Sequence, residues 1–227
     1  MNRKIIADLG GFIQERYGVN LKEDITLLSF FTKVVERIDD QVLSNYFSGQ
    51  DNGWHSGSSF ETRRTGRELV DRINNMNAQK ILDVGCGDNE LKQYFGDKLT
   101  GIDPYNNHAD IQIGIMEYKT DTKYDVVLVL GSLNFGDEKT ILTQLAKAVT
   151  LCKPNGKIFL RANPGITHDH EKAKWIDFYE WSHEKVEEFA NQLGCTVNEL
   201  GWDHDESDEH RWGNRIYAEL TRNAFRK

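Results

Sequence analysis

The stretch ILDVGCGDN, residues 81–89, decides the fold. Four residues typical of a buried strand lead directly into a turn that contains Gly85 and Gly87. Glycine adopts the backbone conformations that a tight turn needs, and it lets a ligand approach the main chain closely. A helix should follow the turn, because apolar residues recur on one side of it at Leu91, Tyr94 and Phe95. A helix that starts there offers unpaired N–H groups to a ligand.

A second acid stands at the end of the next predicted strand. Asp103 closes the run LTGID, residues 99–103, and follows Asp83 of the first strand. An acid in this position accepts hydrogen bonds from both ribose hydroxyls of a nucleoside. Two glycines alone are a weak signal. The glycine turn and the strand-end acid together predict a cofactor that contains a nucleoside.

A dinucleotide such as NAD is one alternative for this cofactor. The dinucleotide fingerprint needs a third glycine, but its sixth position is Glu90 in this chain. Asp83 lies two residues before the first glycine, where its charge would repel a phosphate. A ligand with a cationic amino group and no phosphate would be accepted there. Glu90 and Asp83 therefore disfavour an NAD-dependent oxidoreductase.

Short apolar runs alternate with helical stretches from residue 80 onward. The runs that predict parallel strands are KILDV (80–84), LTGID (99–103), IQIGI (111–115), YDVVLVL (124–130) and GKIFLRA (156–162). Runs such as VVLVL are apolar at every position, as in strands that are covered on both faces. This alternation predicts an α/β fold with a Rossmann-like, doubly wound sheet.

The C-terminal part completes the expected sheet. Two runs, CTVNEL (195–200) and NRIYAEL (214–220), predict an antiparallel hairpin. With the five parallel strands this makes a seven-stranded sheet. Helices are expected at 137–151 and at 182–193, the second capped by Ser182.

The chain divides into two expected parts. Residues 1–76 are predicted to form a helical N-terminal extension and substrate lid, and residues 77–227 the cofactor-binding core. The extension should hold helices at 3–17 and 21–47, a Gly- and Ser-rich loop at 48–60 and a third helix near Thr65. Thr65 and Glu68 have the spacing of a capping box.

Composition and charge exclude several classes of protein. The 227 residues carry a formal net charge of −8, which disfavours non-specific binding to the phosphate backbone of nucleic acid. No run approaches the roughly 18 apolar residues of a membrane span, and the first residues lack the apolar segment of a secretory signal. Cys86, Cys152 and Cys195 form no CxxC pair, which favours reduced thiols. We therefore expect a cytoplasmic protein without a membrane partner.

An acidic stretch at 167–210 holds five of the seven histidines: His168, His170, His183, His204 and His210. Together with nearby aspartates they suggest a metal site as an alternative. However, the pair His168 and His170 has no matching close partner in the sequence. A solvated acidic face is the preferred interpretation, and no metal is expected.

The motifs LDVGCGDN, GIDP, YDVVLVLGSLNF and LCKPNGKIFL occur in this order along residues 79–162. In this they resemble class I S-adenosylmethionine-dependent methyltransferases. The resemblance implies S-adenosyl-L-methionine as cofactor, methyl transfer as activity and a seven-stranded sheet. Many members have a third glycine where this chain has Asn89.

The resemblance also implies which residues hold the cofactor. They are Asp83, Gly85, Cys86 and Gly87 at the methionine end, Asp103, Pro104, Tyr105, Ile115 and Met116 at the ribose and adenine, and Gly131 and Ser132 beside the sulfonium. Asp83 would hold the amino group of the cofactor, and Asp103 would bind its ribose.

The acceptor side points away from nucleic acid. Family members that methylate exocyclic amines of bases carry an Asn/Asp-Pro-Pro-aromatic motif after the fourth strand. The corresponding place here reads GSLNFG, residues 131–136, without proline. The absence of this motif favours a small-molecule acceptor.

Catalytic candidates come from the ends of the fourth and fifth predicted strands and from the loop that precedes the core. Ligands of doubly wound sheets bind at the carboxyl ends of the strands, which is where Ser132, Asn134, Arg161 and Asn163 are expected. Ser132 and Asn134 have a second interpretation, as caps of the next helix. Arg161 is expected to hold a carboxylate or phosphate of the acceptor, or the carboxylate of the cofactor.

The loop at 48–65 is expected to close over the site. It contributes Trp54, His55, Phe60, Arg63 and Arg64. His55 is the preferred general base because the unperturbed pKa of histidine lies near neutrality. Arg64 is, with Arg161, the second candidate for binding an anionic group of the acceptor or cofactor.

The sequence thus predicts a methyltransferase that acts on an unidentified small-molecule acceptor. The alternative is a module that binds S-adenosylmethionine without catalysis, for example a regulatory subunit. Product formation distinguishes the two. An enzyme yields S-adenosylhomocysteine from some acceptor, whereas a module binds both forms of the cofactor and converts neither.

Overall fold

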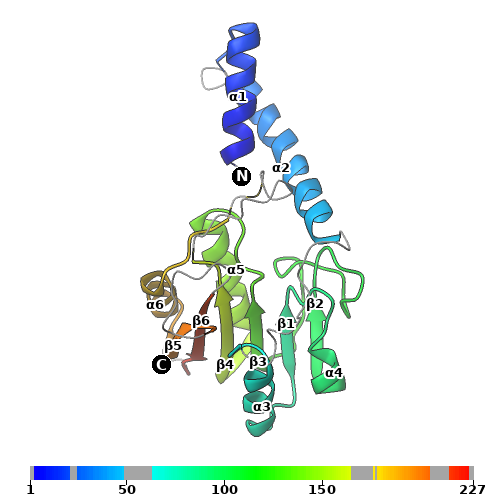
Figure 1. Cartoon of the computed structure of the whole chain (residues 1–227), viewed down its shortest axis with the longest axis vertical. Helices are drawn as coiled ribbons and strands as arrows, with labels where there is room; N and C mark the ends of the chain where they lie inside the picture. The colour runs from blue at the N-terminus through cyan, green and yellow to red at the C-terminus, as the bar shows by residue number, and fades with distance from the viewer. Residues whose placement is uncertain are drawn as a thin grey trace.

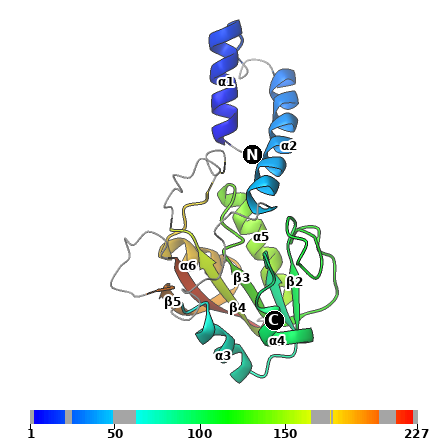
Figure 2. The same cartoon turned by 45° about the vertical axis from the view of Figure 1, so that its right-hand side comes forward.

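Two long helices stand away from an α/β body in the computed structural model (Figure 1). The structure describes residues 3–20, 25–48, 63–164, 176, 178–204 and 215–224. The projecting helices are α1 (Arg3–Tyr17) and α2 (Ile25–Ser48), close to the predicted ranges. Figure 2 shows them on the same side of the body after a 45° turn.

The body is built on one mixed sheet with the strand order β2-β1-β3-β4-β6-β5. Its parallel strands are β1 (Ile81–Val84), β2 (Leu99–Ile102), β3 (Tyr124–Leu130) and β4 (Cys152–Ala162). Its antiparallel hairpin consists of β5 (Cys195–Trp202) and β6 (Ile216–Arg222), with β6 antiparallel to β4 as well. The predicted Rossmann-like α/β class and the C-terminal hairpin are confirmed.

Within the described ranges the sheet has six strands, so the prediction of seven was wrong by one. The expected strand at 111–115 is reduced to a single parallel bridge between Ile111 and Ile102. On the N-terminal side of this bridge a side chain takes the place of a backbone acceptor, because Asp110 Oδ2 accepts the N–H of Gly101 at 2.8 Å. The segment therefore touches the edge of β2 without extending along it.

Helices cover both faces of the sheet because alternate residues of each buried strand point to opposite sides. On one face, α3 (Arg67–Asn75) buries Leu69, Val70 and Ile73. On the other face lie α5 (Glu138–Leu151) and α6 (His183–Gln192), packed on a larger apolar cluster. The helix after the glycine loop, α4 (Lys92–Phe95), has only one turn and continues into the 3₁₀ turn η1 (Gly96–Lys98).

The helix starts test the predicted caps. Ser182 Oγ accepts the N–H of Lys185 at 3.2 Å, so the predicted cap of α6 is confirmed. The predicted capping box at Thr65 is wrong, since Gly66 is the N-cap of α3 and no side chain caps it. The Thr65 hydroxyl instead donates to Asp203 Oδ2 at 2.9 Å. This bond joins the start of α3 to the residue that follows β5.

Apolar packing connects the predicted extension with the body. α3 falls inside the range 1–76, yet its apolar side chains belong to the core cluster of the sheet. Val42 and Leu43 of α2 pack on buried Ile176, together with the rings of Phe135 and Phe178. The arrowheads of β1 and β2 point toward the side on which α1 and α2 stand (Figure 1). The extension thus stands over the end of the sheet where ligands of this architecture bind.

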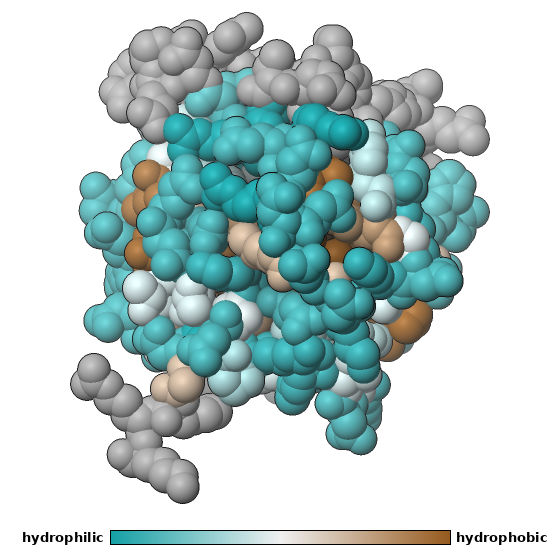
Figure 3. All heavy atoms as spheres, turned by 90° about the horizontal axis from the view of Figure 1, so that it is seen from below, coloured by the Kyte–Doolittle hydropathy of each residue, from teal (hydrophilic) through white to brown (hydrophobic). Residues whose placement is uncertain are grey.

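The end of the body farthest from α1 and α2 presents a mostly hydrophilic surface, with apolar residues in small separate patches (Figure 3). Isolated apolar residues are normal on a protein surface. Within the described ranges, no helix is both long enough and apolar enough to cross a membrane.

Candidate functional site

Two buried carboxylates lie at the carboxyl ends of β1 and β2. Asp83 is 5% exposed and Asp103 is 9% exposed. Asp83 accepts no hydrogen bond from any described residue. Burial, and then the charge of Asp103, raise the pKa of Asp83 to about 7. A cationic ligand group beside Asp83 would counter both effects, which fits the expected amino group of the cofactor.

Asp103 organises the loop that carries the glycines. Its Oδ1 accepts the backbone N–H groups of Tyr105 and Asn106 at 2.8 and 2.9 Å. Its Oδ2 accepts the N–H of Gly87 at 3.1 Å. A carboxylate has about four lone-pair sites, so Asp103 retains acceptor capacity for a ribose hydroxyl.

Gly85 and Gly87 of the loop differ in what surrounds the position of the absent Cβ. Both have positive φ, +68° at Gly85 and +54° at Gly87. A Cβ at Gly85 would collide with the Cβ of Ser132, so this glycine brings the loops after β1 and β3 together. A Cβ at Gly87 would meet nothing within 4 Å. Gly87 therefore leaves its backbone open to a ligand, as a cofactor loop requires.

Asn89 explains why this chain can lack the third glycine of the resembling family. Its φ is +57°, in the left-handed region. Asparagine is one of the few residues with a side chain that enter this region readily. Its Nδ2 donates to the carbonyl oxygen of His108 at 3.2 Å, which holds the side chain in place. The substitution preserves the backbone conformation that glycine would provide.

Cys86 packs beneath this loop. Burial, followed by the charges of Asp83 and Asp103, raises the pKa of its thiol well above the ordinary range. A Cβ at Gly101 would lie 2.9 Å from Cys86 Sγ and 2.5 Å from Asn89 Oδ1. The Cys86 thiol is therefore protonated, and Gly101 of the GIDP motif leaves the space that its sulfur occupies; the contact of Cys86 with the cofactor stays a prediction.

The predicted adenine residues lie around the exit of β2. A Cβ at Gly114 would lie 4.0 Å from Cβ of Pro104, so the 111–116 segment runs beside Pro104. Ile115 is buried in the core, while Met116 is 43% exposed. Ile111, which the sequence analysis missed, is 41% exposed, and its carbonyl accepts the N–H of Asp103 at 3.3 Å. Ile111 was missed because the motif predicted a regular strand there.

Asn134 connects the loops that follow β3 and β4. Its Nδ2 donates to the carbonyl of Gly131 and its Oδ1 accepts the N–H of Asn163, both at 2.8 Å. It does not cap α5, whose N-cap is Asp137. With both ends of its amide engaged and only 4% of its surface exposed, Asn134 holds these two loops together, and its catalytic role stays a prediction.

Arg161 lies at the same end of the sheet. Its Nη2 is 3.5 Å from the point where a Cβ of Gly131 would stand. Its side chain is 15% exposed, and Nη1 is 4.0 Å from Asp203 Oδ2. Burial, opposed by Asp203 and reinforced by Arg63 and Arg215, lowers the pKa of Arg161 to about 10. The guanidinium remains a cation at neutral pH.

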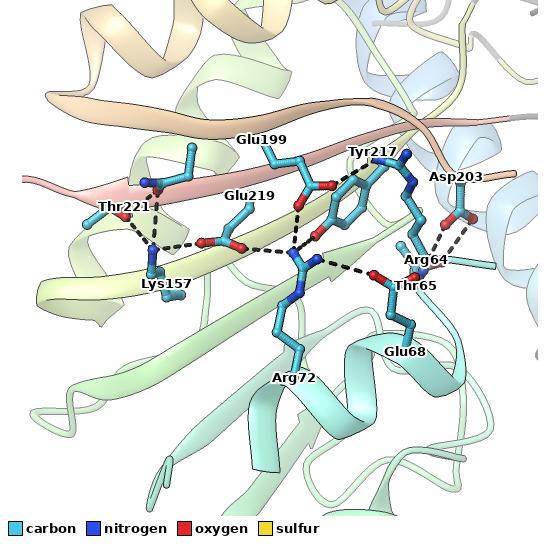
Figure 4. Close-up of polar contacts among 11 residues, drawn as sticks. Arg64, Thr65, Glu68, Arg72, Lys157, Glu199, Asp203, Tyr217, Glu219 and Thr221 are labelled. Carbon is cyan, nitrogen blue, oxygen red and sulfur yellow. Dashed lines mark hydrogen bonds and ion pairs between the residues drawn. The ribbon is translucent and has the colours of Figure 1, made fainter. Parts of the chain in front are cut away.

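Arg64 is placed elsewhere, against the expectation that it binds the cofactor. Its Nη1 donates to Glu199 Oε1 at 2.9 Å, and its guanidinium carbon is 6.0 Å from the centre of the Tyr217 ring. Figure 4 shows it directed at the β5–β6 hairpin. A carboxylate and an aromatic ring on that face attract Arg64 away from the glycine loop.

The neighbours of Arg64 form a polar network that the sequence analysis missed (Figure 4). Arg72 of α3 donates to Glu199 at 2.7 Å and to Glu219 at 3.0 Å. Lys157 of β4 donates to the other oxygen of Glu219 at 2.6 Å. The network ties α3 to the hairpin and so fixes residues 63–65, which precede the helix.

Several predicted residues fall outside the described part of the chain: Trp54, His55, Phe60, His168, His170 and His210. The general base and the metal alternative at these residues therefore stay predictions. Among the residues that the structure does describe, no group of three or more His, Cys, Asp or Glu side chains is arranged to hold a metal ion.

Three solved structures share the architecture. The 1,6-didemethyltoxoflavin-N1-methyltransferase of Burkholderia thailandensis, with 1,6-didemethyltoxoflavin and S-adenosylhomocysteine bound, is 14% identical (TM-score 0.62), over 85% of this chain and 90% of that chain. The N-methyltransferase NodS of Bradyrhizobium japonicum, in complex with S-adenosylhomocysteine, is 16% identical (TM-score 0.60), and the match covers 81% of this chain and 98% of that chain. The magnesium protoporphyrin IX methyltransferase of Synechocystis, with S-adenosylmethionine bound, is 15% identical (TM-score 0.56), and the match covers 82% of this chain and 97% of that chain.

No protein-family model matches the sequence, and no curated protein matches it. The likeness to the solved structures is one of fold, because their identity to this chain is low. It agrees with the resemblance that the motifs suggested. The chain has the fold of the class I S-adenosylmethionine-dependent methyltransferases.

Proposed function

We propose that this protein is an S-adenosylmethionine-dependent methyltransferase that acts on a small-molecule acceptor. One observation carries the proposal. The buried carboxylate of Asp83, which lacks a hydrogen bond in the described structure, lies beside Asp103 and the open backbone of Gly87. Asp83 suits the ammonium of the cofactor, Asp103 suits its ribose, and the open backbone at Gly87 leaves room for its methionine end.

The cofactor residues would act as follows. Asp83 pairs with the amino group, and Asp103 accepts hydrogen bonds from the ribose. The exposed side chains of Met116 and Ile111 offer an apolar surface for the adenine beside Pro104. Gly131 and Ser132 follow β3 and border the reacting end of the ligand.

When bound, S-adenosylmethionine supplies a methyl group: a lone pair of the acceptor bonds to the methyl carbon while the carbon–sulfur pair returns to sulfur, leaving S-adenosylhomocysteine. The contribution of the protein is to orient the acceptor and to exclude water. Asn134 fixes the two loops on either side of the acceptor position. His55 is proposed to take a proton from the acceptor where one must leave.

The comparisons support the small-molecule acceptor. Two of the similar proteins are named for 1,6-didemethyltoxoflavin and magnesium protoporphyrin IX, which are small molecules. A nucleic-acid acceptor has no such support, and the acidic net charge of −8 opposes it.

Titration calorimetry with S-adenosylhomocysteine, and with NAD as control, tests the proposal. We expect a dissociation constant near micromolar, about −8 kcal/mol, for S-adenosylhomocysteine and no binding of NAD. Binding of NAD alone would overturn the cofactor assignment. Conversion of labelled S-adenosylmethionine in the presence of a small-molecule acceptor library then separates an enzyme from a non-catalytic module.

A further inference from the structure

The guanidinium of Arg161 has no hydrogen-bond partner among the residues that the structure describes. In the described part of the chain it donates none, and its buried Nε has no partner. A guanidinium has five N–H donors, and burying a cation without partners is unfavourable. Such a group in a native fold requires an explanation, and a bound anion is one.

Asp203 does not supply the missing bonds. Both of its oxygens accept from Thr65, one from the backbone N–H at 2.8 Å and one from the hydroxyl at 2.9 Å. The separation of 4.0 Å from Arg161 is longer than a hydrogen bond. Arg63 and Arg215 lie close enough to repel the Arg161 charge. The surroundings of Arg161 therefore favour an additional negative charge.

Besides Arg161 Nε, three buried side-chain atoms lack a hydrogen-bond partner in the described part of the chain: one is Asn89 Oδ1, and the other two, Ser132 Oγ and Asn163 Oδ1, belong to the loops that follow β3 and β4. Asn134 holds their loops together by bonding to Gly131 on one side and Asn163 on the other. Asn163 is 2% exposed. Unpaired polar atoms concentrated between two strand ends indicate a site for a polar ligand.

The position of Arg161 in the sheet separates this ligand from the two protein carboxylates that are assigned to the cofactor. Asp83 lies near the end of β1 and Asp103 follows β2, whereas Arg161 lies near the end of β4, on the far side of β3. Neighbouring strands lie about 4.8 Å apart, so β1 and β4 are roughly 10 Å apart. Gly131, expected beside the sulfonium, lies between them and next to Arg161.

We propose that the methyl acceptor carries an oxyanion, a carboxylate or a phosphate, that binds the guanidinium of Arg161. The planar fork of arginine matches the two oxygens of such a group. The inference rests on the proposed function, because it assigns the acceptor of the same site. It restricts the substrate class to small anionic molecules.

Fluorine NMR tests this binding without turnover. The probes are 4-fluorobenzoate and 4-fluorophenyl phosphate, with neutral 4-fluorobenzamide as reference, added to protein saturated with S-adenosylhomocysteine. We expect at least one anion to bind more tightly than the amide. Arg161→Gln should weaken its binding at least roughly tenfold, and Arg161→Lys should weaken it less. The two anions distinguish a carboxylate from a phosphate acceptor.

Arg67→Gln is the matched control. It removes a guanidinium from an exposed ion pair with Asp71, and we expect unchanged binding of the probes. Melting curves verify that each variant is folded. Equal binding by wild type and Arg161→Gln overturns the proposal, as does binding of neither anion above the amide.

A second titration separates acceptor from cofactor. 5′-Methylthioadenosine lacks the amino acid part of S-adenosylhomocysteine. If Arg161→Gln lowers only the affinity for S-adenosylhomocysteine, Arg161 holds the cofactor carboxylate and the proposal is wrong. If wild type binds the anion through Arg161 but not S-adenosylhomocysteine, the anion site stands and the proposed function fails.

Discussion

The ends of β1 and β2 carry acids in a prepared loop, whereas the ends of β3 and β4 carry a cation and unpaired polar atoms. Asp103 accepts three backbone N–H groups, so its loop is organised without a ligand. Arg161 donates to no described residue. Asp83 in the first region also lacks a hydrogen bond from any described residue, so the two regions differ in the ligand group that each one needs: a cation beside Asp83 and an anion beside Arg161.

The largest expected effect is on the first region. Asp103→Ala removes the ribose acceptor and the anchor of the Gly87 N–H. We expect the affinity for S-adenosylhomocysteine and for 5′-methylthioadenosine to fall roughly 100-fold, since two bonds to a charged group are lost. Calorimetry measures both. Asp97→Ala, at an acid of η1, is the control, and retained binding by Asp103→Ala would remove Asp103 from the site.

Asp83→Asn should affect only the ligand with an amino group. We expect the affinity for S-adenosylhomocysteine to fall about 30-fold and that for 5′-methylthioadenosine to stay unchanged, because the charge pair is lost. Equal losses for both ligands would contradict the assignment of Asp83 to the ammonium.

The same variant should stabilise the unliganded fold. The pKa of Asp83 is raised from 3.8 to about 7, so between these pH values the folded chain keeps a proton that the unfolded chain releases. The free energy of unfolding of the wild type therefore falls as the pH rises through this window. Asp83→Asn removes this loss. The melting temperature of Asp83→Asn should exceed that of the wild type by an amount that increases from pH 4 to 7 and is constant above pH 7.

Gly87→Ala and Gly96→Ala form a matched pair. Both glycines have φ +54° and open space around the absent Cβ. Alanine at a positive φ costs at least about 1–2 kcal/mol, so both variants should lose stability, Gly96→Ala the more because its ψ of −135° lies outside the left-handed helical region. Only Gly87→Ala should also lower the affinity for S-adenosylhomocysteine, by about tenfold, because the added methyl group would occupy the space where the ligand approaches the backbone. Equal affinities in the two variants would show that the open backbone at Gly87 is not used.

The first region was predictable from sequence because its parts are local. Asp83, Gly85, Gly87 and Asp103 belong to two consecutive motifs, and the structure brings them together. The details that failed depend on side chains that replace backbone bonds. Asp110, one residue before the expected strand at 111–115, accepts the N–H of Gly101 with its side chain, and only Ile111 of that strand forms a bridge to β2.

The second region was predictable only in part because distant segments build it. Strand-end position predicted Arg161 and Asn163, but their surroundings come from elsewhere. Asp203 lies 138 residues from Thr65, and its engagement there leaves Arg161 without its bonds. No sequence spacing indicates that contact. The placement of Arg64 on Glu199 is likewise a long-range pairing.

The smallest expected effect tests whether Thr65 keeps Asp203 away from Arg161. Thr65→Val removes the hydroxyl that donates to Asp203 Oδ2, the oxygen 4.0 Å from Arg161. We expect a stability loss of about 1 kcal/mol and unchanged affinity for S-adenosylhomocysteine. The released oxygen competes for the guanidinium, so 4-fluorobenzoate or 4-fluorophenyl phosphate should bind about threefold more weakly. Thr143→Val, which removes a hydroxyl from exposed α5, is the control. Unchanged anion binding in Thr65→Val would mean that Asp203 and the ligand do not compete, and the contrast between the two regions would then rest on Arg161 alone.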